Sequence, residues 1–214
     1  MTFVPDLSVL LAFTLAGFVL FVTPGPDMSL FLAKTIAGGR RAGLAAMTGT
    51  SLGCVVHSLL AAFGLSAVIA ASPTLFLVLK IVGALYLLWL AVDAVRNGSS
   101  LNVDPTGGGG NARLWSDLAR GFTVNLSNPK VVLFFVTFLP QFVDAADPHA
   151  AGKLLFLGLY FVVLSYPPAV LLVLAAERLV GGLKRRPRLL RAIDWLFAGV
   201  FSAFAVRLLA TQAR

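Results

Sequence analysis

Charged side chains are scarce in this sequence. Only 12% of the 214 residues are Asp, Glu, Lys or Arg, whereas 58% are hydrophobic. Soluble domains carry about 25% charged residues, because a folded soluble chain needs polar side chains for its surface. This deficit excludes an ordinary soluble domain, and the long apolar runs predict a polytopic membrane protein.

Cysteine is almost absent as well. Cys54 is the single cysteine, and it lies inside an apolar run. One cysteine excludes an intramolecular disulfide, a CxxC redox pair and a multi-cysteine metal site, so we interpret Cys54 as a small buried packing residue. The sequence also lacks HExxH and paired intramembrane carboxylates, which a membrane metalloprotease would need. We therefore expect no enzyme, no cofactor and no metal site.

Six runs of mainly apolar residues are long enough to cross a bilayer as helices. They lie near 7–37, 42–70, 75–96, 118–143, 153–179 and 192–211. The fourth run is interrupted by Asn125, Asn128, Pro129 and Lys130, so it either spans or is re-entrant. The sequence predicts an all-α integral membrane protein with six transmembrane helices.

The net charge of +8 comes from cations that stand between the apolar segments. Most of them fall in the first, third and fifth connections or on their flanks: Arg40, Arg41, Arg96, Arg113, Arg120, Arg178, Lys184, Arg185, Arg186, Arg188 and Arg191. Lysine and arginine are enriched in cytoplasmic loops. We therefore predict that these connections are cytoplasmic, that both termini lie outside, and that the partner is a lipid membrane and not a nucleic acid.

The first apolar segment is too long for one upright helix. Residues 7–37 would extend roughly 46 Å as a helix, whereas the hydrocarbon core is about 30 Å thick. The stretch Thr23-Pro24-Gly25-Pro26-Asp27 predicts where it breaks. Thr23 is a candidate cap for a new helix, a proline suits the first helical position, and a carboxylate such as Asp27 suits the first turn.

The fourth segment contains a matching break. Asn128 is a candidate cap, Pro129 a candidate first helical residue, and Lys130 follows it. Gly17-Phe18 and Gly121-Phe122 precede the two breaks at nearly the same distance. Two broken helices three spans apart are typical of an inverted repeat, with its substrate site between the breaks. We predict three-helix repeats at 1–98 and 118–214, joined by a cytoplasmic Gly-rich linker at 99–117.

Two charged residues next to the breaks are the main candidates for substrate binding. Asp27 and Lys130 could hold the amino and carboxyl groups of a zwitterion, and we expect them to lie close together beside a water-accessible cavity. The alternative is that they pair only with each other and stabilise two kinked helices. Thr23, Pro24, Gly25, Pro26, Asn125, Asn128 and Pro129 complete the predicted binding and gating set.

Four further features carry predictions, two of them with two interpretations. His57, together with Asp27, could relay protons at physiological pH, or His57 could hold two helices together by a hydrogen bond. Gln141 and Tyr166 are candidates for the pathway. Pro167-Pro168 is either a hinge or a static kink, and Gly49xxxGly53 is a candidate close-packing face.

Several motifs in this order resemble the LysE/RhtB family. They are Pro24-Gly25-Pro26-Asp27; Gly49, Gly53, His57 and Gly64-Leu65; Leu79-Lys80, Gly83-Ala84 and Tyr86-Leu87; and Gly121-Phe122, Asn125, Asn128-Pro129-Lys130, Phe134-Phe135 and Leu139-Pro140-Gln141-Phe142. The resemblance implies a bacterial inner-membrane secondary exporter of amino acids, driven by the proton gradient. The sequence looks closer to the RhtB branch, which implies neutral substrates such as homoserine, threonine or leucine rather than basic ones.

Other functions fit the sequence less well. A related transporter of a metal cation or another small solute is the main alternative, but Asp27 and His57 offer few ligands and Lys130 would repel a cation. A membrane scaffold would not need two matched helix breaks. The expected partners are an amino acid and a proton or other coupling ion, with a homo-oligomer as a further expectation. In the LysE/RhtB family the residue after Pro-Gly-Pro is Asp or Asn. The sequence therefore does not decide whether the mechanism needs a negative charge at position 27.

Overall fold

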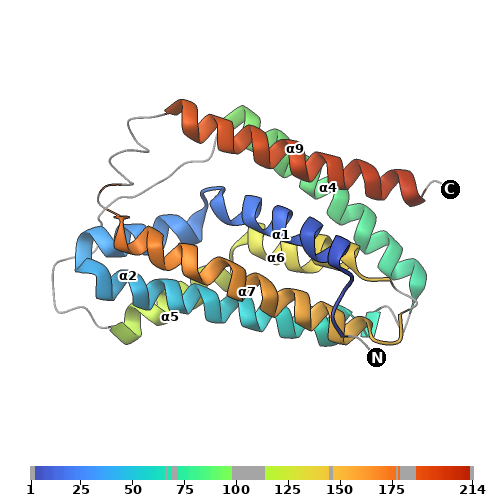
Figure 1. Cartoon of the computed structure of the whole chain (residues 1–214), viewed down its shortest axis with the longest axis horizontal. Helices are drawn as coiled ribbons and strands as arrows, with labels where there is room; N and C mark the ends of the chain where they lie inside the picture. Colours follow the sequence, from blue (N-terminus) through green and yellow to red (C-terminus); the bar gives the residue numbers. More distant parts are fainter. Residues whose placement is uncertain are drawn as a thin grey trace.

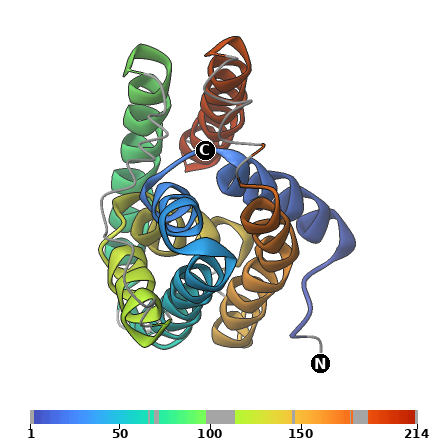
Figure 2. The same ribbon diagram turned by 90° about the vertical axis from the view of Figure 1, so that its left-hand side faces the viewer.

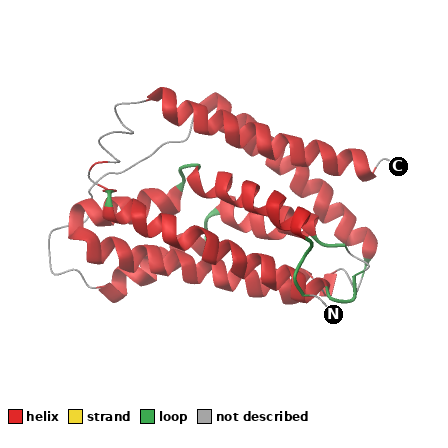
Figure 3. Ribbon diagram, in the orientation of Figure 1, coloured by secondary structure: helices red, strands yellow, loops and turns green. Residues whose placement is uncertain are grey.

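The structure is a computed structural model of the chain, and it describes residues 3–65, 67–68, 72–97, 114–144, 147–176, 178 and 187–212. Every regular element in these ranges is a helix (Figure 3). The predicted all-α class is therefore confirmed. Most of the predicted linker 99–117 lies outside the described residues, and its last four residues belong to a helix.

The described helices follow one another along the chain as Figure 1 labels them. They are α1 (Leu7–Val22), α2 (Pro26–Leu60), the π-helical turn η1 (Ala61–Leu65), α4 (Pro73–Asn97), α5 (Leu114–Leu126), α6 (Pro129–Leu133), η2 (Phe134–Phe138), η3 (Leu139–Phe142), α7 (Ala150–Leu174) and α9 (Pro187–Gln212).

Two described helical stretches are long and apolar enough to cross a membrane, namely Pro26–Leu65 and Ala150–Leu174. The bent pair Leu114–Leu126 and Pro129–Phe142 qualifies as a third when it is taken as one broken span. Leu7–Val22 and Ile81–Asp93 are shorter apolar helices. These lengths fit a membrane protein, whereas six spans stay a prediction.

Gly39 folds α2 back on itself. Its backbone has φ 80° and ψ 176°, a conformation that glycine adopts readily and other residues rarely do. The arms on either side, 26–38 and 40–60, lie side by side (Figure 1), and a Cβ atom on Gly43 would meet the Oγ1 of Thr35. The predicted connection between segments 7–37 and 42–70 is thus a turn of a few residues.

The second arm of α2 lies directly against α5. A Cβ atom on Gly49 would stand 2.0 Å from the carbonyl oxygen of Leu118, and one on Gly121 would stand 1.9 Å from that of Ala46. Glycines allow such backbone approach between membrane helices. The predicted close-packing face at Gly49 and Gly53 therefore receives α5.

α4 and α9 form a separate pair beside the other helices (Figure 2), with Ala84 and Ala205 buried between them. α9 also reaches the bundle, because Phe201 packs on Phe138 with ring centroids 4.9 Å apart. Large apolar side chains remain exposed around the molecule, among them Trp89 and Val163. Such exposure is unfavourable in water but favourable in a bilayer.

Both predicted helix breaks are present. α1 ends at Val22 and α2 starts at Pro26; α5 ends at Leu126 and α6 starts at Pro129. The second break bends the chain by 53°. Pro167 and Pro168, by contrast, lie inside the continuous helix α7, which does not decide between a hinge and a static kink.

The tight α2–α5 contact leads to a stability prediction. Gly49→Ala and Gly121→Ala should each lower the free energy of unfolding by about 1–3 kcal/mol or more, because the new methyl group meets backbone atoms that cannot rotate away. The measurement is thermal or denaturant unfolding of the purified protein in detergent.

Gly199→Ala in α9 is the matched control, because a Cβ atom there meets nothing within 4 Å. It should leave stability unchanged or raise it slightly, since alanine has the higher helix propensity. Equal stability of all three variants would contradict the packing described here.

Candidate functional site

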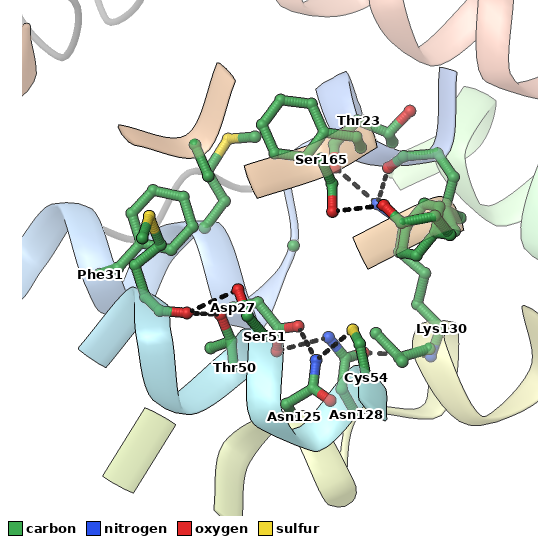
Figure 4. A pocket seen from close by; sticks show the side chains of 18 residues that line it. Thr23, Asp27, Phe31, Thr50, Ser51, Cys54, Asn125, Asn128, Lys130 and Ser165 are labelled. Atoms are coloured by element: carbon green, nitrogen blue, oxygen red, sulfur yellow. Dashed lines mark hydrogen bonds between the residues drawn. The ribbon is translucent and has the colours of Figure 1, made fainter. Parts of the chain in front are cut away.

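The two helix breaks face a common cavity (Figure 4). Its empty volume is about 640 Å³, including open space at its mouth. Polar groups at the breaks line one part of it: Thr23, Gly25, Asp27, Asn125, Asn128 and Lys130. Six of the nine residues that the sequence predicts for binding and gating therefore lie on one cavity.

Lys130 belongs to the second break but binds the first. Its ammonium donates hydrogen bonds to the carbonyl oxygens of Leu20 at 2.8 Å and Thr23 at 2.6 Å. The last carbonyls of a helix have no partner inside that helix, and they attract cations. The side chain also runs along Gly25, and its Nζ lies 5.8 Å from the ring centre of Phe197.

Asp27 belongs to the first break but is held by the second. One carboxylate oxygen accepts from Asn125 Nδ2 at 2.5 Å, and the other accepts from Asn128 Nδ2 at 2.9 Å. Asn128 also caps α6, because its Oδ1 accepts from the backbone N–H of Lys130 at 3.1 Å. The carboxylate thus joins the start of α2 to the end of α5 and the start of α6.

The structure has no salt bridge between Asp27 and Lys130, so the alternative interpretation, in which they pair only with each other, is wrong. Each charge is satisfied by groups of the opposite break, as Figure 4 shows for the carboxylate. Both side chains still line the same cavity. The site therefore holds a carboxylate bound by amides and an ammonium bound by carbonyls.

The expected cap at Thr23 is wrong. Gly25 occupies the N-cap position of α2, Pro26 follows as its first residue, and Asp27 lies in the first turn. Thr23 instead ends α1, where its hydroxyl donates to the carbonyl oxygen of Val19 at 2.7 Å. A threonine hydroxyl readily makes this bond one turn back in its own helix, which holds it at the end of α1 and not at the start of α2.

The prolines shape the breaks without lining the cavity. Pro24 is buried, whereas Pro26 and Pro129 are exposed. Pro26 and Pro129 each take the opening position of a helix, where the missing N–H needs no partner.

His57 lies behind the cavity wall and not on it. Its Nε2 lies 3.4 Å from the carbonyl oxygen of Asn125, and its ring stacks on Phe135 at 5.5 Å. This arrangement is the helix–helix contact that was one of the two interpretations, and the proton relay stays a prediction. Gln141 donates to Thr137 O at 3.1 Å, and Tyr166 is 39% exposed; neither lines the cavity.

The apolar wall of the cavity was missed from the sequence. It includes Leu20, Phe21, Met28, Phe31, Met47, Val131, Phe161 and Ala169, with Thr50, Ser51, Cys54 and Ser165 between them. The position of Gly39 in the sequence could have identified part of this wall. Positions 27 and 51 are equally far from Gly39, so folding α2 at that glycine sets Asp27 opposite Ser51 and its neighbours.

Comparison with known proteins agrees with this architecture. The family profile described as LysE type translocator matches residues 18–212. The chain belongs to this family. It is therefore a membrane transporter and not an enzyme, and the resemblance in its motifs is confirmed.

Several relatives resemble the chain over nearly its whole length. A leucine efflux protein of Klebsiella pneumoniae is 31% identical over 210 residues, 95% of each chain. One of an Enterobacter species is 30% identical over 197 residues, 92% of each. An uncharacterized membrane protein of Pseudomonas aeruginosa is 31% identical over 188 residues, 86% of this chain and 87% of the relative. No solved structure matches the chain.

The crossed contacts lead to a prediction on the two charges. Asp27→Asn and Lys130→Met should each destabilise the protein by about 1–3 kcal/mol, because each leaves buried polar groups without a hydrogen-bond partner. The two sets of partners share no side-chain atom, so the effects should add within about 1 kcal/mol. Unfolding of the two single variants and the double variant in detergent measures this.

Ser51→Ala is the control, because Ser51 lines the same cavity but donates to Met47 O of its own helix. It should change stability little. A double variant as stable as the starting protein would instead indicate that Asp27 and Lys130 pair directly, since removing both partners of a buried pair relieves the cost of losing one.

Proposed function

We propose that the protein is a secondary transporter that exports a neutral amino acid across the bacterial inner membrane. The observation that carries this proposal is the cavity, which offers a carboxylate, an ammonium group and an apolar wall. Two of the relatives are named leucine efflux proteins, which supports export and a neutral substrate.

The three parts of the cavity match the three parts of such a substrate. The amino group binds at Asp27, and the carboxylate binds at Lys130. An apolar side chain of the substrate then contacts residues such as Met28, Phe31 and Met47. A basic side chain would lose its hydration against this wall without gaining an opposite charge, which favours neutral over basic amino acids.

Substrate binding at Lys130 is coupled to the end of α1. The ammonium already binds the carbonyls of Leu20 and Thr23, so a substrate carboxylate competes with the contacts that hold the first break. In this proposal the substrate loosens α1 from Lys130 as it binds. Protonation of Asp27 is the proposed route of coupling to the proton gradient, because that carboxylate takes the substrate amino group.

The repeat arrangement is part of the proposal. Gly17 of α1 packs against Phe161 of α7, whereas Gly121 of α5 packs against Ala46 in the second arm of α2. The first helix of each half thus contacts the second helix of the other, and the third helices, α4 and α9, pair together (Figure 2). Two halves related by a two-fold axis would make these contacts.

The six-span orientation is also proposed. The turn of α2, the start of α5 and the end of α7 lie at one end of the molecule, and α1 begins and α9 ends at the other (Figure 1). Arg40, Arg41 and Arg178 are exposed at the first end. Positive charge favours the cytoplasmic side, which supports a cytoplasmic turn and external termini.

The cavity lies between two apolar clusters of different extent. A large cluster, with Phe13, Phe134, Phe138 and Leu154 among its members, separates it from the end with the termini. A smaller one, with Phe31, Met47, Ala169 and Val173, separates it from the arginine end. α7 contributes to both clusters, and Pro167-Pro168 lies between its two contributions. The smaller cluster is the proposed cytoplasmic gate.

Counterflow in proteoliposomes tests the substrate. Leucine, threonine and homoserine, each labelled in turn, should exchange against an unlabelled pool, and leucine should exchange at least tenfold faster than lysine. Lys130→Met should reduce exchange more than tenfold. Arg41→Gln removes an exposed cation away from the cavity and should leave the rate unchanged. Absence of exchange for every neutral amino acid, or a preference for lysine, would refute the proposal.

Cysteine labelling in sealed cells tests the orientation. In a Cys54→Ser background, Arg41→Cys and Arg188→Cys should react with a membrane-impermeant maleimide only after the cells are opened. Asp144→Cys, exposed at the opposite end, should react in intact cells. Labelling of residue 188 from outside would overturn the proposed sidedness without bearing on the substrate.

A further inference from the structure

A second pocket lies at the arginine end of the molecule, apart from the cavity. The turn of α2 forms one wall with Thr35, Gly39 and Arg40, and the end of α7 with the residues just after it forms the other, with Leu171, Leu174 and Arg178. Its empty volume is about 1080 Å³, including open space. The substrate proposal assigns no ligand to this pocket.

The wall formed by the end of α7 has two parts, an apolar part with Leu171 and Leu174 and a cationic part with Arg178. Leu171 and Leu174 are three positions apart, which sets them along one face of α7. Leu171 is 65% exposed and Leu174 44% exposed, so these leucines have open space in front of them. Arg178 follows just beyond the end of α7 and is exposed as well.

The α2 wall supplies a second cation. Arg40 comes directly after Gly39, where the chain reverses, and is exposed. A Cβ atom on Gly39 would meet nothing within 4 Å, so the turn leaves this side of the pocket open. None of the described residues that line the pocket is acidic. The pocket therefore presents two guanidinium groups and a strip of exposed leucine.

We propose that this pocket binds one anionic phospholipid of the cytoplasmic leaflet. The headgroup phosphate lies between Arg40 and Arg178, and an acyl chain lies along Leu171 and Leu174. Guanidinium groups bind phosphate oxygens in pairs of hydrogen bonds, and basic pockets between helices suit anionic headgroups. The leucines extend the site toward the hydrocarbon, as a phospholipid requires and a free anion does not.

An amino acid fits the pocket less well. Its ammonium group would find two arginines and no carboxylate among the described lining residues. The pocket is also separated from the cavity by the small apolar cluster that contains Phe31 and Val173. A phospholipid satisfies the two cations and covers the leucines together, which is why it is the proposed occupant.

Lipid titration of the detergent-purified protein tests the proposal. Dioleoylphosphatidylglycerol is added, and native mass spectrometry counts the bound molecules. The starting protein should retain one molecule that dioleoylphosphatidylcholine does not replace. The double variant Arg40→Gln with Arg178→Gln should weaken that binding about 30-fold. Each cation near an anionic lipid surface contributes about 1 kcal/mol of binding free energy, and about 1.4 kcal/mol changes the affinity tenfold.

Arg188→Gln with Arg191→Gln is the matched control, because both arginines are exposed at the start of α9 and neither lines the pocket. This pair should weaken binding less than threefold. An equal loss in both double variants would overturn the proposal in favour of diffuse charge attraction. Leu171→Asn should also weaken binding of the intact lipid, and unchanged binding would remove the acyl contact from the proposal.

Competition separates the sources of the anion. Glycerol phosphate and leucine, each at millimolar concentration, should leave the phosphatidylglycerol in place. Displacement by glycerol phosphate would show a phosphate site without lipid specificity, and displacement by leucine would show a substrate vestibule. Either result refutes the lipid proposal. The readout is binding, so it stands apart from the transport experiment.

Discussion

A helix that stops inside a membrane leaves backbone carbonyl and amide groups that lipid cannot satisfy. This chain interrupts two apolar segments with such helix ends, and each break depends on the other. Lys130, just after the second break, binds the carbonyls at the end of α1, and the amides of Asn125 and Asn128 bind Asp27 just after the first. Neither break is satisfied alone, so the two halves of the chain must meet at this point.

The close helix contacts follow from that requirement. Asn125 reaches Asp27 only if α5 lies against the second arm of α2, and Gly53 leaves the room for it, because a Cβ atom there would lie 2.3 Å from the Asn125 Oδ1. Gly49 and Gly121 extend the same approach along the helices. The turn at Gly39 then returns the second arm of α2 to the level of Asp27. The glycines thus let the helices approach closely enough for Asn125 to reach Asp27.

Local chemistry explains why the breaks were predictable from the sequence. A proline suits the first position of a helix, so Pro26 and Pro129 indicated where the helices restart, and Asn128 indicated the cap of the second one. The partners of Asp27 lie about 100 positions away and depend on packing, which explains why the sequence did not identify the two amides as its partners. The apolar wall had no signal of its own, because in an apolar helix periodicity does not separate cavity-facing from lipid-facing side chains.

The crossed contacts also change what a ligand has to displace. Breaking a direct buried ion pair leaves an uncompensated charge and costs about 3–5 kcal/mol. Here a ligand ammonium that approaches Asp27 meets a carboxylate held by neutral amides, and a ligand carboxylate that approaches Lys130 competes with neutral carbonyls. Each exchange replaces a neutral partner with a charged one, and charge-assisted hydrogen bonds are roughly twice as strong as neutral ones. Binding of the proposed zwitterionic substrate would therefore not require two opposite charges to be separated first.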